Sequence, residues 1–310
     1  MKKIIIVCFL FALASCKKDN TGTSKLFETL SANTTETLTD ISFINKDEGI
    51  ISGSYGYLAK TSDGGKTWNK LTVGVNHSFM SAYMLTPQLF YTARVGIYKT
   101  TNAGQNFSEC SDLSKYSNSI FGIHFFNKDI GLVVKGNVIL KTTDGGDNWV
   151  IKYDEAEYLS EMHVTSAQTG YAAGGITYDG ASHGEMHKTT DGGETWKRIL
   201  TTNSQITAMY FINDNTGFYA DFAKNLYKTT DGGTSWSKVA GLLYSPLSIC
   251  FTSEHNGYFA TYEGKILQTA DGGNTWNTVY EKTTEPIVRI IAVQQTIYAA
   301  GNNGLLLKRN

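Results

Sequence analysis

The sequence predicts an all-β fold, a seven-bladed β-propeller whose blades each contain four strands. One phrase, Lys-Thr-Thr-Asp-Gly-Gly-x-Thr-Trp, recurs along the chain with its Asp or Asn positions 39, 42, 47, 40 and 40 residues apart. Periods near ~40 residues are typical of stacked supersecondary units. Short apolar runs alternate with Gly-rich turns between these phrases, and helical periodicity is absent after the first residues. Both observations favour a ring of small antiparallel sheets.

The units can be laid over one another element by element. In the first, an apolar run at Ile41–Ile44 is followed by a polar turn and a Gly-initiated strand at Gly49–Ser52. A second turn then leads to a strand that ends in Lys60-Thr61, and the recurring phrase connects this strand to a fourth. Four short strands separated by Gly-rich turns are therefore expected in every unit.

The recurring phrase, which we call the repeat turn, is predicted to be a tight connection between two strands. Its two glycines supply positive φ, and its Asp and Thr side chains can accept hydrogen bonds from backbone N–H groups. Its Trp is a large apolar plate that can pack between units. Because every Trp of the chain holds this one position, we expect packing rather than catalysis. The predicted structural residues are Asp63, Trp68, Asn102, Asp144, Trp149, Asp191, Trp196, Asp231, Trp236, Asp271 and Trp276.

The repeat turn resembles the Asp-box, (Ser/Thr)-x-Asp-x-Gly-x-x-(Trp/Phe), also called the bacterial neuraminidase repeat. The fuller unit is most similar to the photosystem II assembly/stability factor-like repeat family, and this resemblance covers nearly the whole mature chain. It implies a β-propeller. Sialidases, xyloglucanases, sortilin-type receptors and assembly factors share the motif, so the resemblance says much less about activity.

The first residues are predicted to be processed and lipidated. Residues 1–15 have two lysines and a short apolar run, which is typical of a signal peptide. Leu13-Ala14-Ser15-Cys16 resembles a bacterial lipobox, which implies cleavage before Cys16 and lipid on its thiol. Ordinary secretion with cleavage elsewhere is the alternative. Residues 16–24 form a polar tether too poor in apolar residues to fold alone. Lys17 after the cysteine favours the outer membrane, on its periplasmic or its external side.

Residues 25–310 are predicted to form a single propeller that the N-terminus closes. A seventh unit starts at Ile287 but has no repeat turn, so its fourth strand must come from elsewhere. Lys25–Leu30 resembles the Trp strand of other units and is expected to complete the seventh blade. Closure of this kind removes exposed sheet edges. Six blades with a loose tail is the alternative.

Charge and cysteine content exclude several classes. Without residues 1–15 the formal net charge falls from −1 to −3, because Lys2 and Lys3 are lost, and this gives no basic field for nucleic acid. Cys110 and Cys250 lie three to four repeats apart, so no disulfide is expected. His183, Glu185 and His187 alternate along one segment but lack a visible fourth ligand, so neither a metal nor a cofactor is predicted.

The turns between second and third strands lie on the disc face opposite the repeat turns, and this face is predicted to bind a partner. Its insertion, Gly175–His187, is either a recognition loop or a tolerated surface loop. Mixed aromatic and polar residues suit a protein loop or a glycan. We therefore expect a monomeric, non-catalytic binding or assembly module of the bacterial envelope. The predicted binding residues are Tyr55, Arg94, Lys135, Tyr178, His183, Asp221, Phe222, Tyr262 and Glu263.

The alternative is a xyloglucanase-like glycoside hydrolase that acts through Asp40 and Glu161, because both are expected at the start of an inner strand. Two carboxyls about 5–9 Å apart in a cleft would favour this enzyme. A sialidase is disfavoured, since three arginines must grip its substrate carboxylate. The chain has only Arg94, Arg198, Arg289 and Arg309, and Arg309 lies at the very end of the sequence. The arginine-rich patch of the assembly-factor family is likewise reduced to Arg94 and Lys135.

Overall fold

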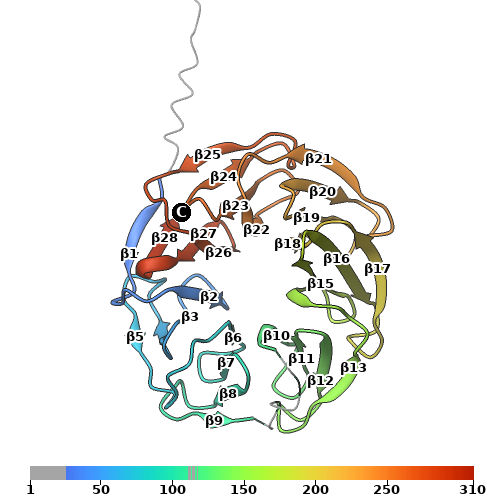
Figure 1. Cartoon of the computed structure of the whole chain (residues 1–310). Coiled ribbons are helices and arrows are strands. Elements are labelled where there is room, and N and C mark those ends of the chain that lie inside the picture. The colour runs from blue at the N-terminus through green and yellow to red at the C-terminus, as the bar shows by residue number, and fades with distance from the viewer. Residues whose placement is uncertain (1–25, 111–112, 114–115, 117) are drawn as a thin grey trace, which may run out of the picture.

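The computed structural model describes residues 26–110, 113, 116 and 118–310, and these form seven four-stranded antiparallel sheets arranged as blades around a central axis (Figure 1). The predicted signal peptide, the lipidation site Cys16 and the tether lie outside the described residues. Within the described part of the chain, no helix has the length and apolar character needed to cross a membrane. The predicted fold class is confirmed.

Each blade runs from an inner strand to an outer strand. The inner strands, such as β2, β6, β10, β18, β22 and β26, lie nearest the centre of Figure 1, and the outer strands, such as β1, β5, β9 and β25, lie at its rim. The first three blades are β2 (Leu38–Phe43), β3 (Gly49–Gly53), β4 (Leu58–Thr61) and β5 (Asn69–Lys70); β6 (Ser81–Met84), β7 (Phe90–Ala93), β8 (Ile97–Thr100) and β9 (Ser108–Glu109); and β10 (Ile120–Phe125), β11 (Gly131–Lys135), β12 (Val138–Thr142) and β13 (Val150–Tyr153). The next three are β14 (Leu159–Val164), β15 (Gly170–Tyr178), β16 (Ala181–Thr189) and β17 (Lys197–Thr202); β18 (Ile206–Phe211), β19 (Gly217–Asp221), β20 (Asn225–Thr229) and β21 (Ser237–Gly241); and β22 (Pro246–Phe251), β23 (Gly257–Thr261), β24 (Ile266–Thr269) and β25 (Asn277–Tyr280).

The seventh blade joins the two ends of the described chain. It contains β26 (Ile287–Val293), β27 (Thr296–Gly301), a short 3-10 turn (Asn302–Gly304), β28 (Leu305–Arg309) and, as its outer strand, β1 (Glu28–Ser31). β1 pairs antiparallel with β28 from Glu28↔Lys308 to Ser31↔Leu305. The predicted N-terminal closure is confirmed, although the strand lies at Glu28–Ser31 rather than Lys25–Leu30.

The hydrophobic core lies between neighbouring blades. The last residue of several inner strands is a Phe whose ring stacks on an aromatic ring of the preceding blade, as Phe125 does on Tyr91 with centroids 3.9 Å apart. Trp149, from the repeat turn of the same blade, meets Phe125 edge-on at 6.1 Å. Such stacked and edge-on pairs each add stabilisation beyond the buried area. Trp149 therefore packs against the core, in the way predicted for the Trp of the repeat turn.

The same Phe explains why glycine begins the second strand of these blades. A Cβ placed on Gly131 would lie 2.6 Å from Cε1 of Phe125, too close for any real contact. Gly49, Gly217 and Gly257 face a Phe ring in the same way. Only glycine fits at these positions, because the Phe ring lies where the Cβ of any other residue would be.

The repeat turns have the hydrogen bonds expected from their sequence. In the first, the N–H of Gly65 donates to Thr61 Oγ1 and the N–H of Thr67 donates to Asp63 Oδ1, both at 2.9 Å. Both glycines adopt positive φ, 72° at Gly64 and 84° at Gly65. The turns also join blades, since a Lys side chain donates to a Gly carbonyl in the next turn: Lys99 to Gly145, Lys141 to Gly192, Lys188 to Gly232 and Lys308 to Gly64.

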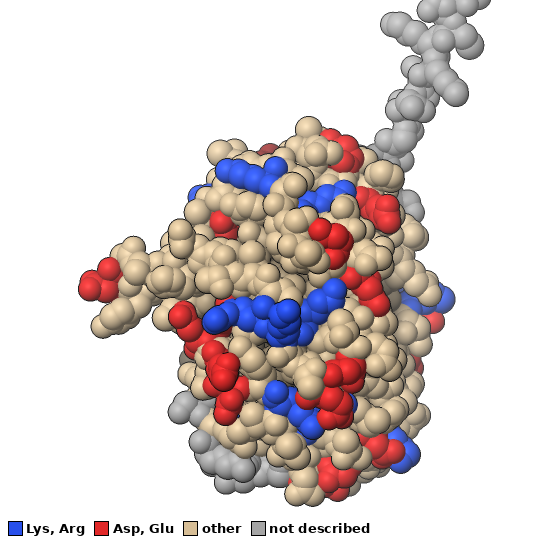
Figure 2. All heavy atoms as spheres, turned by 90° about the vertical axis from the view of Figure 1, so that its right-hand side faces the viewer, with Lys and Arg blue, Asp and Glu red and all other residues tan. Residues whose placement is uncertain are grey.

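The insertion in the fourth blade is a β-hairpin rather than an irregular loop. β15 and β16 remain paired as far as Tyr178↔Ala181, and Asp179 and Gly180 turn the chain with positive φ. Its outer residues are exposed, and the hairpin projects beyond the disc at the left of Figure 2. Figure 2 also shows basic and acidic side chains interspersed along this side of the rim.

Candidate functional site

The site lies in the central channel, where the inner strands share one irregularity. In six of the inner strands the register shifts by one residue near the strand start, between Leu38 and Asp40 in β2 for example. A bulge of this kind redirects the side chain that follows it. The residues after the shift are Asp40, Gly122, Glu161, Ala208, Ser248 and Arg289, so three charged side chains occupy equivalent positions in three blades.

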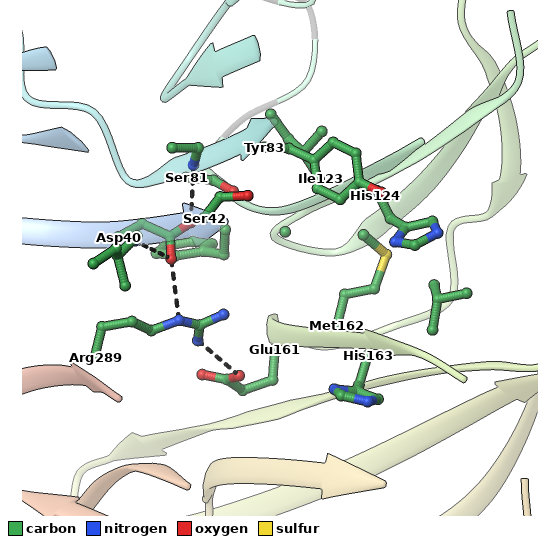
Figure 3. A pocket seen from close by; sticks show the side chains of 15 residues that line it. Asp40, Ser42, Ser81, Tyr83, Ile123, His124, Glu161, Met162, His163 and Arg289 are labelled. Atoms are coloured by element: carbon green, nitrogen blue, oxygen red, sulfur yellow. Dashed lines mark hydrogen bonds and ion pairs between the residues drawn. The ribbon is translucent and has the colours of Figure 1, made fainter. Parts of the chain in front are cut away.

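These three charges meet inside the channel (Figure 3). Arg289 Nε lies 3.0 Å from Asp40 Oδ1, and Arg289 Nη1 lies 3.6 Å from Glu161 Oε2. Asp40 has further partners, because its carboxylate accepts the N–H of Ile41 at 2.9 Å and the N–H of Ala82, in the next blade, at 2.8 Å. Among the described residues, Arg289 is the one ion-pair partner of Glu161. Asp40 thus has three polar partners, Arg289 and the N–H groups of Ile41 and Ala82, whereas Glu161 has the ion pair with Arg289.

Burial and charge act against each other on these groups. Burial raises the pKa of Asp40 despite the nearby guanidinium of Arg289. Burial also raises the pKa of Glu161 to about 7, since the lowering by Arg289 is partly cancelled by the charge of Asp40. Burial opposes the charge of Arg289, yet the two carboxylates together raise its pKa. The pKa of Glu161 consequently lies near neutral pH.

Two cavities share Asp40, Glu161 and Arg289, which we call the ion group. At the mouth, a cavity of about 210 Å³ is lined by the ion group and by Thr39, Met80, Phe121, Ser160, Leu247 and Val288. A cavity of about 200 Å³ is lined by the same charges together with Ser42, Tyr83, His124 and His163, which come later along their strands. Burial lowers the pKa of both His124 and His163 to about 4, so both imidazoles are neutral at physiological pH. The structure places the two predicted carboxylates here, but joined through an arginine.

The mouth opens on the face of the turns between second and third strands, because each inner strand begins at that face. Four of the predicted binding residues are exposed there: Tyr55 at 76%, Tyr178 at 80%, Phe222 at 61% and Tyr262 at 61%. Leu243, in the connection from β21 to β22 on the same face, is 76% exposed and was not predicted. The connections between blades also reach this face. A Leu within such a connection, outside the strand pattern, is the sequence signal that could have identified Leu243 as exposed.

Two of the predicted binding residues are buried, which corrects the sequence-based prediction for them. Lys135 lies inside, where its Nζ donates to the carbonyls of Val95 and Asn118 at 2.9 and 2.7 Å. Asp221 is also buried and accepts the N–H of Asn225 at 2.8 Å. Lys135 thus holds the neighbouring β7–β8 turn and the connection between the second and third blades, whereas Asp221 satisfies its own turn, and neither side chain is presented on the face.

The remaining predicted binding residues differ in how they are held. Glu263 accepts the N–H of Ser245 at 2.9 Å and lies 3.6 Å from Lys224 Nζ, so it braces the adjoining connection. Arg94 is half-buried, and His183 is exposed on the hairpin.

Cys110, Cys250 and two of the three alternating residues, Glu185 and His187, are buried. Glu185 and His187 are buried, 3.0 Å apart, while His183 is exposed. The described residues contain no group of three His, Cys, Asp or Glu suited to a metal ion. Cys110 and Cys250 are both buried and free, as expected. Cys250 lines the channel, where burial raises the pKa of its thiol and keeps it protonated.

Comparisons with known proteins identify relatives of the fold. The family described as "Photosynthesis system II assembly factor YCF48" matches residues 19–111. The solved structure "YCF48 bound to D1 peptide" superposes with a TM-score of 0.77 at 22% identity, covering 91% of this chain and 96% of that one. YCF48 from Cyanidioschyzon merolae gives 0.75 at 19% identity, covering 92% and 99%.

A glycosidase shares the architecture more distantly. The GH74 xyloglucanase from Xanthomonas campestris gives a TM-score of 0.70 at 11% identity, covering 92% of this chain but only 54% of the enzyme. No curated protein matches the sequence. The chain therefore has the β-propeller fold of the YCF48 structures, and residues 19–111 match the family model of that assembly factor.

Proposed function

We propose that this chain is a non-catalytic binding or assembly module of a bacterial cell envelope, anchored through a lipid on Cys16. Its partner is a protein segment that lies across the face around the channel mouth. The observation that carries the proposal is the set of exposed aromatic side chains, Tyr55, Tyr178, Phe222 and Tyr262, contributed by four different blades to one face. Exposed aromatics collected on one surface are characteristic of protein interfaces.

The comparisons support a protein partner rather than a glycan. A similar solved propeller, YCF48, is titled as bound to a D1 peptide. This chain shares its fold at 22% identity. The parallel therefore lies in the mode of binding, a peptide segment on a propeller, and the identity of the bound segment does not carry over.

The ion group argues for binding over hydrolysis. Asp40 already accepts two backbone N–H groups and pairs with Arg289, and Glu161 pairs with the same guanidinium. A glycosidase needs one carboxyl as a proton donor and the other as a base or nucleophile on the substrate. Neither role is open to Asp40 while these contacts persist.

The experiment is an affinity capture from detergent-solubilised envelope, with the lipidated protein as bait. We expect a protein partner to be captured by the wild type and lost with a Tyr55→Ala/Tyr262→Ala double variant. A Val150→Ala/Ile151→Ala variant, which also removes exposed apolar side chains but at an outer strand, serves as the matched control and should retain it.

Two results would overturn the proposal. Capture that is equal in all three proteins would show that the aromatic face does not bind the partner. Glycan retention or glycan release that depends on Asp40 or Glu161, without a protein partner, would favour the hydrolase instead.

A further inference from the structure

The channel contains more negative than positive charge. Asp40 and Glu161 contribute two carboxylates, and Arg289 is the one basic side chain other than the histidines that lines the three cavities given by the described residues. Arg289 is closer to Asp40, at 3.0 Å, than to Glu161, at 3.6 Å. Glu161 therefore makes the longer of the two contacts with Arg289 and has no other ion-pair partner among the described residues.

The groups that face Glu161 from the neighbouring strands do not supply the missing positive charge. His124 on β10 and His163 on β14 are neutral because burial lowers the pKa of each to about 4. Cys250 on β22 and Tyr210 on β18 remain protonated, since burial raises the pKa of both. Asp40 on β2 adds a like charge, and Arg289 on β26 is shared.

The mouth of the channel has the shape and polarity for a particular kind of cation. The cavity of about 210 Å³ has apolar walls from Met80, Phe121, Leu247 and Val288. Glu161 and Arg289 both border this cavity, the cavity of about 200 Å³, and a third of about 240 Å³ that Tyr210 and Cys250 also line. An apolar passage that leads to a carboxylate suits an alkyl chain with a charged end, because the stem buries apolar surface while the ammonium pairs with the acid.

We propose that the channel mouth binds a primary alkylammonium group, supplied by a lysine side chain of the bound protein segment, with the ammonium on Glu161 and the stem against Met80, Phe121, Leu247 and Val288. This inference rests on the proposed function, since it names the side chain that the segment inserts. A free diamine has the same chemistry and is distinguished by the experiment below.

The binding should depend on pH in a defined direction. The ammonium pairs with the ionised form of Glu161, whose pKa in the empty channel is about 7. Affinity is therefore highest above pH 7 and falls as the pH is lowered through 7, because the ligand must then displace a proton. The histidines stay neutral until much lower pH, because burial lowers the pKa of each to about 4.

The first test uses small probes and purified protein. Titration with 1,5-diaminopentane at pH 8, followed by NMR chemical shifts, should give saturable binding, whereas 1-pentanol of the same length should bind at least tenfold more weakly. Glu161→Gln should weaken diamine binding at least tenfold, and so should a change to pH 6 in the wild type. Glu281→Gln is the matched control, because this exposed carboxylate on the rim pairs only loosely with Lys265 at 3.5 Å.

The second test separates the two sources of the amine. In the envelope capture, Glu161→Gln should reduce recovery of the partner at least fivefold, and a peptide of the captured segment should lose affinity when its lysine is replaced by norleucine. If Glu161→Gln loses the diamine but retains the partner, the occupant is a free amine. Equal diamine affinity in wild type and Glu161→Gln overturns the inference, while the Tyr55/Tyr262 result still decides the proposed function independently. A thermal melt confirms that each variant is folded.

Discussion

Arg289 of β26 lies 3.0 Å from Asp40 of β2, so a salt bridge in the channel joins the last blade to the first. Asp40 also accepts the N–H of Ala82 in the second blade. One carboxylate thereby connects three consecutive blades at the point where the ring closes. This contact at the inner strands adds to the closure at the outer edge, where β1 pairs with β28 and the chain then continues into β2 of the first blade.

Arg289→Met should destabilise the propeller. The substitution keeps much of the side-chain volume but leaves Asp40 and Glu161 buried without a counter-charge, which costs about 2 kcal/mol, less than in a fully buried pair because the guanidinium is one-third exposed. Urea unfolding should show a lower midpoint than that of Arg198→Met, whose arginine is half-exposed on β17. Equal midpoints would show that the salt bridge does not hold the ring.

Glu161→Gln should change how stability depends on pH. The folded pKa of Glu161, about 7, exceeds its ordinary value of 4.5, so the folded state retains a proton that the unfolded state has lost. Wild-type stability should therefore fall between about pH 4.5 and 7, by on the order of 3 kcal/mol, and stay level above that window. The variant should lack this fall. Parallel curves of unfolding free energy against pH for both proteins would contradict the assignment.

Phe27→Ala should show how much the N-terminal segment stabilises the ring. Phe27 is 5% exposed and meets Tyr280 of the sixth blade edge-on at 6.0 Å, so its removal leaves a cavity that costs about 3 kcal/mol. Leu26→Ala is the neighbouring control, since Leu26 is 73% exposed and should be neutral. Thermal melting measures both, and similar melting temperatures would mean that the segment is not packed as described.

Gly131→Ala should be costly although alanine is the smallest change available. The new Cβ would lie 2.6 Å from the ring of Phe125, which is itself stacked on Tyr91, so the ring cannot move freely. We expect a loss of about 1–3 kcal/mol in unfolding free energy. Gly241→Ala meets no atom within 4 Å and is the control. If Phe125→Leu does not relieve the loss, the clash is not its cause.

Asp144→Asn should reduce stability at neutral pH but not in acid. Hydrogen bonds from the side chain and then the backbone of Asn148 lower the pKa of Asp144 to about 2, so the carboxylate contributes stability above its ordinary value of 3.8 that is lost as the pH falls toward 2. The turn at Asn102 already has an amide in this place and keeps the same backbone hydrogen bond, from Asn106. The melting temperature should drop by roughly 1–3 °C at pH 7 and converge with wild type near pH 2.

The fold could be predicted because the turn residues of each repeat are close together in the sequence and interact with one another. Gly64, Gly65 and Asp63 form a tight turn through short-range hydrogen bonds, and these were foreseeable from residue type alone. The glycines that begin four of the second strands, Gly49, Gly131, Gly217 and Gly257, were visible in the sequence, but the reason for them was not. That reason is a Phe ring of the same blade, held flat by an aromatic residue of the preceding blade.

The site was predicted only in part. Asp40 and Glu161 were identified from their place at the start of inner strands, and Tyr55, Tyr178, Phe222 and Tyr262 were correctly expected at exposed turns. Lys135 and Asp221 were assigned to the same surface but are buried. Lys135 donates to a carbonyl of the neighbouring blade that no local pattern reveals, and Asp221 accepts the N–H of Asn225 within its own turn.

The sequence by itself determined the number of blades, the strands within each blade and the faces to which the turns belong, because these depend on residues close together in the chain. Only the tertiary structure decided that Arg289 lies between Asp40 and Glu161. Their positions become equivalent only when the ring closes and each inner strand bulges at the same point. Charges far apart in sequence then share one desolvated channel, and their pKa values follow from that proximity.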